Sequence, residues 1–262
     1  MAPHLARIDL YPIKSLDGMA VTTAAVLQSG ALQHDRAFAL FDHTGRFVNG
    51  KRFAQIHQVR SLLSPNLSQI TVWVDHQSAT RSTFLLLEEQ AQFEAWCSDH
   101  FQQPVTLRHN LAMGFPDDTD SPGPTVVSTA TLQTIADWYG LDLAETRRRF
   151  RSNLEIDGVP AFWEDQLFSS SGDPVPFQIG QVTFWGINPC QRCVVPTRDA
   201  HTGSPTAGFQ TTFVQRRAAT LPPTVARSRF NHFYRLAVNT QLAPNSKLTP
   251  VCVGDSVTVL TR

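Results

Sequence analysis

Two cysteines three positions apart lie in the segment NPCQRCVVPTRDAHTG, residues 188–203. Taken alone, the pair Cys190/Cys193 fits packed cysteines in a turn, because free cysteine favours the protein interior. It also fits half of a zinc site, but a structural site needs four ligands at paired spacings, and Cys97 and Cys252 are isolated in the sequence. A thioredoxin-type dithiol would require a helix directly after the pair, which the proline of VVP disfavours.

The surroundings of Cys193 favour metal chemistry. Arg192 is a cation next to it in sequence, and a nearby cation favours the thiolate that soft metals bind. Pro196 is expected to keep the following segment extended, and residues 199–203 (DAHTG) are expected to form a turn that closes the loop. We therefore predict that Cys193 is a single anionic sulfur ligand for a metal, with Cys190 in a structural role.

The composition narrows the function classes. The 262 residues can bury a sizeable core as one large domain or two small ones. Lys and Arg equal Asp and Glu at 22 each, so no global charge attracts nucleic acid or a membrane surface. The N-terminal sequence has no apolar stretch of signal-peptide length and no run is long enough to span a bilayer, so a cytoplasmic location is expected. Four cysteines are too few for a disulfide framework.

Most of the first half reads as strands and turns. The segments LARIDLYP, AVTTAAVL and RAFALFD are predicted strands, and residues 70–74 alternate as a half-buried strand does. Residues 88–101 change to helical spacing. Residues 110–125 are rich in Pro, Gly and Asp, which predicts a loop at the boundary between an N-terminal module and the rest.

Two short helices are predicted after this loop. One ends at Gly140, and the second is capped by Asp142 with Glu145 in a capping-box pattern. The second is expected to run through Arg149, with residues 147–149 (RRR) forming a solvated helix end. Alternation with period two then returns. The sequence thus predicts a mainly β, barrel-like protein with inserted short helices, whose later strands cover residues 153–156, 181–186, 233–239 and 251–260.

Motifs spread over nearly the whole chain resemble the MOSC family, in the branch with an extra N-terminal β-barrel module. The chain is similar to mitochondrial amidoxime-reducing components and their bacterial counterparts. It implies a β-barrel-like module over residues 1–115 and a β-barrel MOSC domain over residues 116–262. The matching pieces are LYPIKS (10–15), HDRAFALFD (34–42), VVSTATL (126–132), RFRSNLEIDG (149–158), FWED (162–165), PCQRC-x-x-P-x-x-D-x-x-TG (189–203) and VGDSV (253–257).

The resemblance implies a molybdenum–molybdopterin cofactor, and no pyridoxal phosphate. It makes Cys193 the metal ligand and the catalytic residue. Arginine can bind a phosphate through two parallel hydrogen bonds, and an asparagine amide can meet the polar edge of a pterin. Each candidate also has an ordinary alternative as a surface charge or a cap. The residues implied to bind the cofactor are Lys14, Ser15, Arg36, Ser128, Arg151, Asn153 and Arg192.

The chain departs from the resemblance in three places. Ser152 replaces a proline usual between the Arg and Asn, which loosens the backbone. Residues 166–180 are longer than usual, so the rim of the site is expected to differ. The chain lacks the C-x₄-C-x₂-C spacing of the plant-type 2Fe–2S domain that some bacterial relatives carry. Electrons are therefore expected from an external donor protein, ferredoxin- or cytochrome-like.

These observations lead to three hypotheses about function. The first is a molybdenum-dependent reductase of small N-hydroxylated, amidoxime-like substrates. The second is sulfur transfer through a Cys193 persulfide, and the third is a molybdopterin carrier without turnover. Partners other than the electron donor and a small-molecule substrate are not expected, and neither nucleic acid nor membrane is among them.

Overall fold

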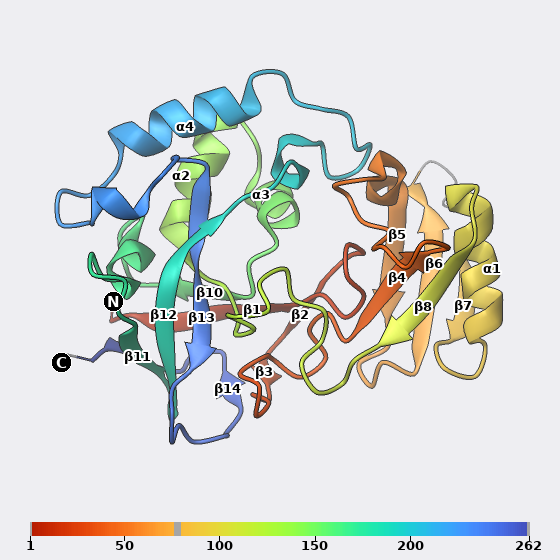
Figure 1. The fold of residues 1–262 in the computed structure, drawn as a ribbon, viewed down its shortest axis with the longest axis horizontal. Coiled ribbons are helices and arrows are strands. Elements are labelled where there is room, and N and C mark those ends of the chain that lie inside the picture. The colour runs from red at the N-terminus through yellow and green to blue at the C-terminus, as the bar shows by residue number, and fades with distance from the viewer. Residues whose placement is uncertain (1, 76–79, 261–262) are drawn as a thin grey trace.

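The computed structural model describes residues 2–75 and 80–260. Strands dominate and the helices are few and short, which confirms the predicted fold class. The strands form one large sheet and three smaller ones. The large sheet and the smaller sheets of the N-terminal part lie on opposite sides of the molecule (Figure 1).

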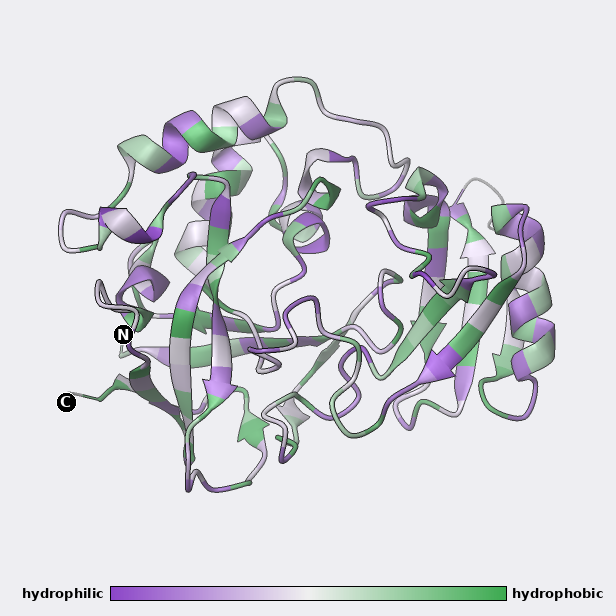
Figure 2. Ribbon diagram, viewed as in Figure 1, coloured by the Kyte–Doolittle hydropathy of each residue, from purple (hydrophilic) through white to green (hydrophobic). Residues whose placement is uncertain are grey.

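The large sheet has eight strands in the order β15-β11-β12-β13-β9-β10-β1-β2. Neighbouring strands are antiparallel except β9 and β10, which are parallel. Hydrophobic and hydrophilic residues alternate along its strands (Figure 2), as expected when one face of a sheet is buried. The strands are β1 (His4–Leu10), β2 (Met19–Val21), β9 (Val126–Ser128), β10 (Leu154–Asp157), β11 (Val175–Ile179), β12 (Val182–Gln191), β13 (Arg235–Leu242) and β15 (Val257–Val259).

The two ends of this sheet come together at the start of β1. His4 forms an antiparallel bridge with Ser256, and the Leu5 amide donates to the Asp255 carbonyl at 2.8 Å. Both contacts lie just before β15, so β1 is flanked by β10 on one side and by the chain near β15 on the other. The sheet therefore curls back on itself as a barrel does. A short pair of strands, β3 (Thr23–Ala24) with β14 (Val251–Cys252), adds a further link between the two ends of the chain.

The N-terminal part beyond residue 24 forms its own layer of smaller sheets. Strand β4 pairs with β8, and β6 lies between β5 and β7. Helix α1 (Gln90–Phe101) covers this layer on its outer side (Figure 1). The domain division at residue 115 stays a prediction, and strand pairing crosses it, since β1 and β2 belong to the large sheet. The strands of this layer are β4 (Phe38–Asp42), β5 (Val59–Leu63), β6 (Gln69–Val74), β7 (Ser82–Leu85) and β8 (Val105–His109).

The remaining helices pack near the large sheet. They are α2 (Thr129–Tyr139), α3 (Leu143–Phe150) and α4 (Phe209–Ala219). Short 3₁₀ helices are η1 (Ala54–Gln58), η3 (Trp163–Leu167), η4 (Val195–Thr197) and η5 (Arg227–Arg229). Within the described part of the chain, no helix combines the length and apolar character needed to cross a bilayer.

The local signals for α2 and α3 are found as predicted. Gly140 ends α2 in the left-handed conformation, and the Asp142 side chain accepts a hydrogen bond from the Glu145 amide at the start of α3. The solvated helix end predicted at residues 147–149 is found at Arg148, which is exposed. Arg147 is half-buried and paired with Glu155, and the prediction is wrong for Arg149. Arg149 is only 4% exposed and is paired with Glu145, because its side chain turns inward from the last turn of α3.

Two predicted strands are divided by turns. The segment AVTTAAVL holds the end of β2 and all of β3, which pair with different strands. Residues 251–260 contain β14 and β15, and Gly254, at φ +97°, lies between them. Alternation in sequence does not show where a strand changes partner, since the pattern of side chains is the same on either side of the turn.

The hydrophobic residues form three cores. The first fills the inside of the large sheet and includes Ile8 and Phe184. The second lies beneath α1 and the smaller sheets and includes Phe93 and Cys97. The third joins the large sheet to the α helices. Cys97 is a packed core residue, and its burial raises the pKa of the thiol.

A buried acidic pair joins η3 to α2 and α4. Asp165 accepts two hydrogen bonds from Arg217, at 2.7 and 2.5 Å, and both side chains are nearly inaccessible. Glu164, only 1% exposed, accepts from the Ser128 amide at 3.2 Å and from the Thr131 hydroxyl at 3.1 Å. Burial, and after it the neighbouring Asp165, raises the pKa of Glu164 from 4.5 to about 7.

This pKa predicts a pH-dependent stability. A carboxyl group whose pKa is raised in the folded state contributes fully below pH 4.5, and that contribution is lost as the pH rises to about 7. Glu164→Gln keeps a hydrogen-bond acceptor but does not titrate. Between pH 4.5 and about 7, we expect the free energy of unfolding of the parent protein to fall by about 3 kcal/mol more than that of Glu164→Gln. Urea unfolding at several pH values measures both. Glu88→Gln, on the surface, is the control, and parallel curves for both variants and the parent would contradict the prediction.

Candidate active site

A cavity of about 990 Å³ lies between the large sheet and the N-terminal layer. Its lining comes from segments within residues 7–73, from the 113–125 loop, from α3 and the turn that follows it, from the chain around the two cysteines, and from Asn239 of β13. Ser128 does not belong to the lining. The residues predicted from the sequence that do line the cavity are Lys14, Ser15, Arg36, Arg151, Asn153, Arg192 and Cys193.

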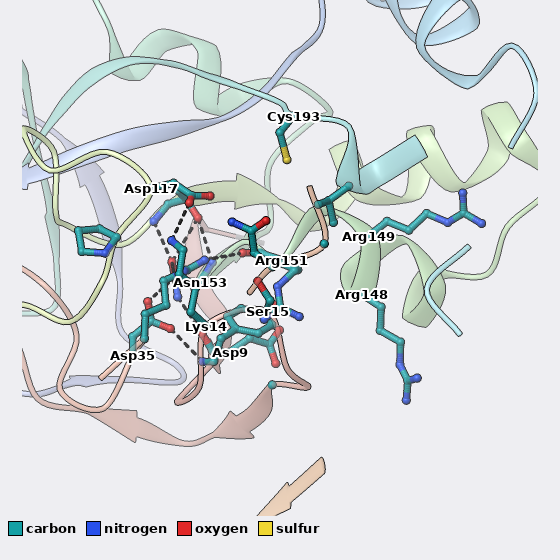
Figure 3. Close-up of a pocket in the computed structure, with 18 of the residues that line it drawn as sticks. Asp9, Lys14, Ser15, Asp35, Asp117, Arg148, Arg149, Arg151, Asn153 and Cys193 are labelled. Carbon is teal, nitrogen blue, oxygen red and sulfur yellow. Dashed lines mark hydrogen bonds and ion pairs between the residues drawn. The ribbon is translucent and has the colours of Figure 1, made fainter. Parts of the chain in front are cut away.

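Cys193 lies between the end of β12 and the start of η4. The residue is half-buried and forms no disulfide. Its thiol points into the cavity, toward Lys14, Arg151 and Asn153 (Figure 3). The expectation that Pro196 keeps the next segment extended is wrong. Val195–Thr197 forms one 3₁₀ turn, because proline is well suited to the first positions of a helix, where its missing amide hydrogen is not needed.

Arg192 contacts the other cysteine. Its Nη1 donates to the sulfur of Cys190 at 3.3 Å, and its Nη2 donates to the Phe150 carbonyl. The sequence placed this cation beside Cys193, but the hydrogen bond that the side chain makes to sulfur is to Cys190. Cys190 also lines the cavity, so both cysteines border the same space.

Lys14 and Ser15 follow β1 where the chain turns toward the N-terminal layer. The Lys14 amide donates to Phe38, which ties this turn to β4, and Ser15 has φ +74°. Lys14 is 6% exposed, and its Nζ donates to the Asp117 carboxylate at 2.6 Å and to the Phe115 carbonyl at 2.8 Å. Burial lowers the pKa of Lys14, while Asp117 opposes that change.

Arg36 and Arg151 share the ring of Tyr11. Their guanidinium groups lie 5.3 and 4.1 Å from its centroid. Arg36 is paired with Asp35, whereas Arg151 donates to the Leu16 carbonyl at 2.6 Å. Burial lowers the pKa of Arg151. For Arg36 the effect of burial is outweighed by the negative charges around it, chiefly Asp35, and its pKa is raised.

Asn153 and Ser128 are held within the protein. The Asn153 amide donates to the Asp9 carbonyl and accepts from Arg36 and from Thr125, so both ends are used. The Ser128 hydroxyl caps α2 by accepting from the Thr131 amide at 3.1 Å. The expectation that Ser128 offers groups to a ligand is therefore not supported by its position. Asn153 contributes to the cavity by fixing Arg36.

The cavity is basic although the whole chain has no net charge. Ten basic residues line it against five acidic ones. Among the residues that the structure describes, Arg148, Arg151 and Arg192 have no carboxylate within ion-pair distance. Figure 3 shows Arg148 pointing away from the thiol of Cys193. The other two unpaired arginines, Arg151 and Arg192, line the same cavity as the thiol. The basic residues are Arg7, Lys14, Arg36, Lys51, Arg60, Arg147, Arg148, Arg149, Arg151 and Arg192, and the acidic ones Asp9, Asp17, Asp35, Asp117 and Asp118.

Several lining residues were not predicted. Tyr11 lies within the quoted LYPIKS motif, so a signal for it was present, whereas Lys51 and Asp117 lie in turns without any pattern. His57 in η1 has a buried Nε2 with no hydrogen-bond partner in the described structure. Burial, and after it the nearby Arg151, Arg198 and Arg60, lower its pKa to about 4, so His57 is neutral near pH 7.

Residues 198–206, here called the arm, connect the thiol segment to the N-terminal layer (Figure 1). Arg60 donates to the Ala200 carbonyl at 3.2 Å, and the His201 ring contacts Asp75 at 2.8 Å. Arg149 donates to Thr206 at 2.9 Å and so fixes the arm to α3. The predicted turn at residues 199–203 is confirmed, since Asp199 accepts from the amides of the next residues.

Two further expectations are corrected or lose support. Residues 166–180 do not line the cavity, so the rim is not changed by them; they lie at η3 and β11 instead. Within residues 2–75 and 80–260, no group of three or more His, Cys, Asp or Glu side chains is placed to hold a metal ion. A zinc site of the usual composition at the two cysteines would need such a group.

Two family models match the chain. The MOSC N-terminal beta barrel domain matches residues 2–104, and the MOSC domain matches residues 125–258. The molybdenum cofactor sulfurase of Drosophila grimshawi is 26% identical over 293 aligned positions, which cover 99% of this chain and 35% of that protein. Molybdenum cofactor sulfurase 1 of Aedes aegypti is 33% identical over 70 positions, covering 27% of this chain and 9% of that protein.

This chain thus spans about a third of the length of the first of these relatives. Among solved structures, the crystal structure of YiiM from Geobacillus stearothermophilus aligns with a TM-score of 0.35 and 11% identity, over 53% of this chain and 55% of that chain. A similarity this low carries no argument about fold or function.

The arm allows a test of how the two sides of the cavity are joined. Gly203 has φ +73°, and a Cβ there would overlap the Ala54 carbonyl of η1. Gly208 has a similar φ of +68° but open space around it, which makes it a matched control. We expect Gly203→Ala to lower the free energy of unfolding by about 2–4 kcal/mol and Gly208→Ala by about 1 kcal/mol, measured by urea unfolding. Equal losses would show that the contact with Ala54 contributes nothing.

Proposed function

This chain belongs to the MOSC family, and from that premise we propose that it binds the molybdenum–molybdopterin cofactor in the cavity between its two sides. In this proposal the Cys193 thiolate is the protein ligand of the metal, and the protein reduces small N-hydroxylated substrates with electrons from an external donor protein. The observation that supports it best is one cavity that combines the inward-pointing Cys193 thiol with a basic surface, here called the floor, formed by Lys14, Arg36 and Arg151.

The residues present fit such a cofactor. Its phosphate is a dianion near neutral pH, and Arg151 and Arg192 are cations without a carboxylate partner in the described chain. The buried Nε atom of Arg192 and the buried Nε2 atom of His57 also lack partners there, so polar groups are available at the lining. Lys14, Arg36 and Arg151 would hold the anionic end, and Cys193 would hold the metal.

The proposed reaction is balanced by two electrons and two protons. The N–O bond of the substrate breaks, its oxygen leaves as water, and the donor protein is oxidised by two electrons in single steps. When bound, the cofactor supplies this redox chemistry, and the protein supplies binding and orientation. Cys193 provides an anionic sulfur, while the paired Arg36 and the free Arg151 orient the anionic end. His57 is neutral at pH 7, so it would serve as a hydrogen-bonding group rather than as an acid.

Sulfur transfer is a second candidate, favoured by the relatives named molybdenum cofactor sulfurases. There, Cys193 would take the outer sulfur of a persulfide from a persulfide-carrying donor protein and pass it to the thiolate of an acceptor. The acceptor thiolate forms the new S–S bond as the bond to the Cys193 sulfur breaks, and Cys193 leaves as a thiolate. A carrier that holds the cofactor without turnover is a third. The three differ in measurable ways: a reductase and a carrier both contain molybdenum, but only a reductase turns over, and sulfur transfer requires a Cys193-bound sulfur.

Metal content tests the role of the thiol. We expect the parent protein, purified from a host that makes the cofactor, to contain close to one molybdenum per chain. Cys193→Ser should lose at least about tenfold in occupancy, because a neutral hydroxyl is a poor ligand for a soft metal. Cys252→Ser removes an exposed thiol elsewhere and should retain the metal. The same molybdenum content in all three proteins, measured by elemental analysis, would rule out Cys193 as the metal ligand.

Turnover separates reductase from carrier. With a chemically reduced dye and benzamidoxime, the loaded parent protein is expected to form benzamidine, and Cys193→Ala is expected to lose at least about a hundredfold in rate. The product is measured by chromatography. If the parent protein is fully loaded with molybdenum and forms no benzamidine, the reductase proposal is contradicted and the carrier hypothesis is favoured. Sulfide released from Cys193 by a thiol reductant, in metal-free protein, would instead favour sulfur transfer.

The floor of the cavity can be tested independently of the thiol. Arg151→Gln removes a buried cation with no carboxylate partner, so we expect about a tenfold loss of cofactor occupancy. Arg148→Gln removes the same charge from an exposed lining residue that points away from the thiol, and it should lose less than about twofold. Equal losses from both variants would mean that only the total charge of the cavity matters.

A further inference from the structure

The 113–125 loop brings an acidic side chain to the basic floor. Asp117 contacts Lys14 at 2.6 Å and Lys51 at 3.7 Å. Partial loss of hydration beside the lysines would raise the pKa of the exposed Asp117 side chain, but Lys14, Lys51 and Arg36 lower it well below its usual range, so this carboxylate is negative at neutral pH. An anion of the protein itself is therefore bound where the proposed function requires the anion of a ligand (Figure 3).

Lys14 cannot keep both of its present hydrogen bonds and also donate all three N–H groups to a ligand anion. An ammonium group has three N–H donors, and two of them are used by Asp117 and the Phe115 carbonyl. Lys14 is buried, with 8% of its side chain accessible, and its Nζ lies 5.1 Å from the ring of Phe47. A stable anion at Lys14 is needed to offset the loss of hydration of this charge.

The Asp117 carboxylate can move away from Lys14 while the backbone of the loop stays in place. The backbone on one side is fixed by the Phe115 amide, which donates to Arg36 at 2.8 Å, and by the packing of the Phe115 ring against Phe41. On the other side, Asp118 accepts from Asn239 at 3.1 Å. The Asp117 side chain between these anchors is 64% exposed, so a rotation about its own side-chain bonds carries the carboxylate into solvent.

From this geometry we propose that Asp117 sets the affinity of the cavity for anionic ligands, by occupying the anion position until a phosphate group displaces it from Lys14. The inference rests on the proposed function, since the phosphate would be that of the cofactor. A phosphate carries about −1.5 to −2 charge near pH 7 and forms stronger hydrogen bonds than a carboxylate monoanion. Asp117 thus stabilises the empty floor and discriminates against weaker anions.

Phosphate titration of cofactor-free protein tests this inference. The protein is made in a host that lacks the cofactor pathway, and inorganic phosphate is added in a calorimeter at constant ionic strength. Asp117→Asn removes the competing charge, so we expect phosphate to bind roughly fivefold more tightly than to the parent protein. Asp120→Asn removes the same charge from an exposed position in the same loop that does not line the cavity, and should change the affinity less than about twofold.

Equal affinity in the parent and Asp117→Asn, or an equal gain in both variants, would overturn the inference. If Asp117→Asn does not fold, as judged by circular dichroism, Asp117→Ser is used with the same expectation. Molybdenum content of the three proteins from a cofactor-making host is a separate readout. A phosphate shift confined to position 117, with no molybdenum in any protein, would support the inference and contradict the proposed function.

Discussion

The floor of the cavity depends on keeping the like charges of Arg36 and Arg151 close together. Arg36 and Arg151 lie on the same ring of Tyr11, in a place where burial disfavours both charges. The negative face of the ring, together with the carboxylate of Asp35, offsets their repulsion. Arg151 has no such carboxylate, so the floor retains a positive charge. A basic site can therefore exist in a chain of no net charge, because the charge is local and fixed.

The fold brings these groups together by connecting distant parts of the sequence. Tyr11 and Lys14 follow β1, Arg36 precedes β4, and Arg151 ends α3. Both arginines adopt left-handed backbone conformations, at φ +51° and +52°, which turn the chain where each side chain enters the floor. Such conformations are unfavourable for residues other than glycine, and they persist where the surrounding contacts fix them. The hydrogen bond from Arg36 to the Arg151 carbonyl is one such contact.

The sequence was informative where a residue's type limits its role. Strand alternation, the cap at Asp142 and the turn at residues 199–203 follow from local chemistry and were predicted. The resemblance named Lys14, Arg36, Arg151 and Cys193, which line one cavity, although their roles stay predictions. What could not be predicted is which distant group a side chain would meet. Local patterns contain no information on such pairs, so the hydrogen bond from Arg192 to Cys190 was not predicted and the inward turn of Arg149 was interpreted wrongly.

The position of β1 has a consequence for how the chain can be divided. Its first residues hydrogen-bond to β10 on one side and to the chain before β15 on the other, although β1 belongs to the opposite end of the sequence. A fragment beginning after residue 115 would lack this strand and expose the backbone edge of β10 to water, where unpaired strands associate with other chains. A cut between the two sequence modules would therefore remove a strand from the middle of the large sheet.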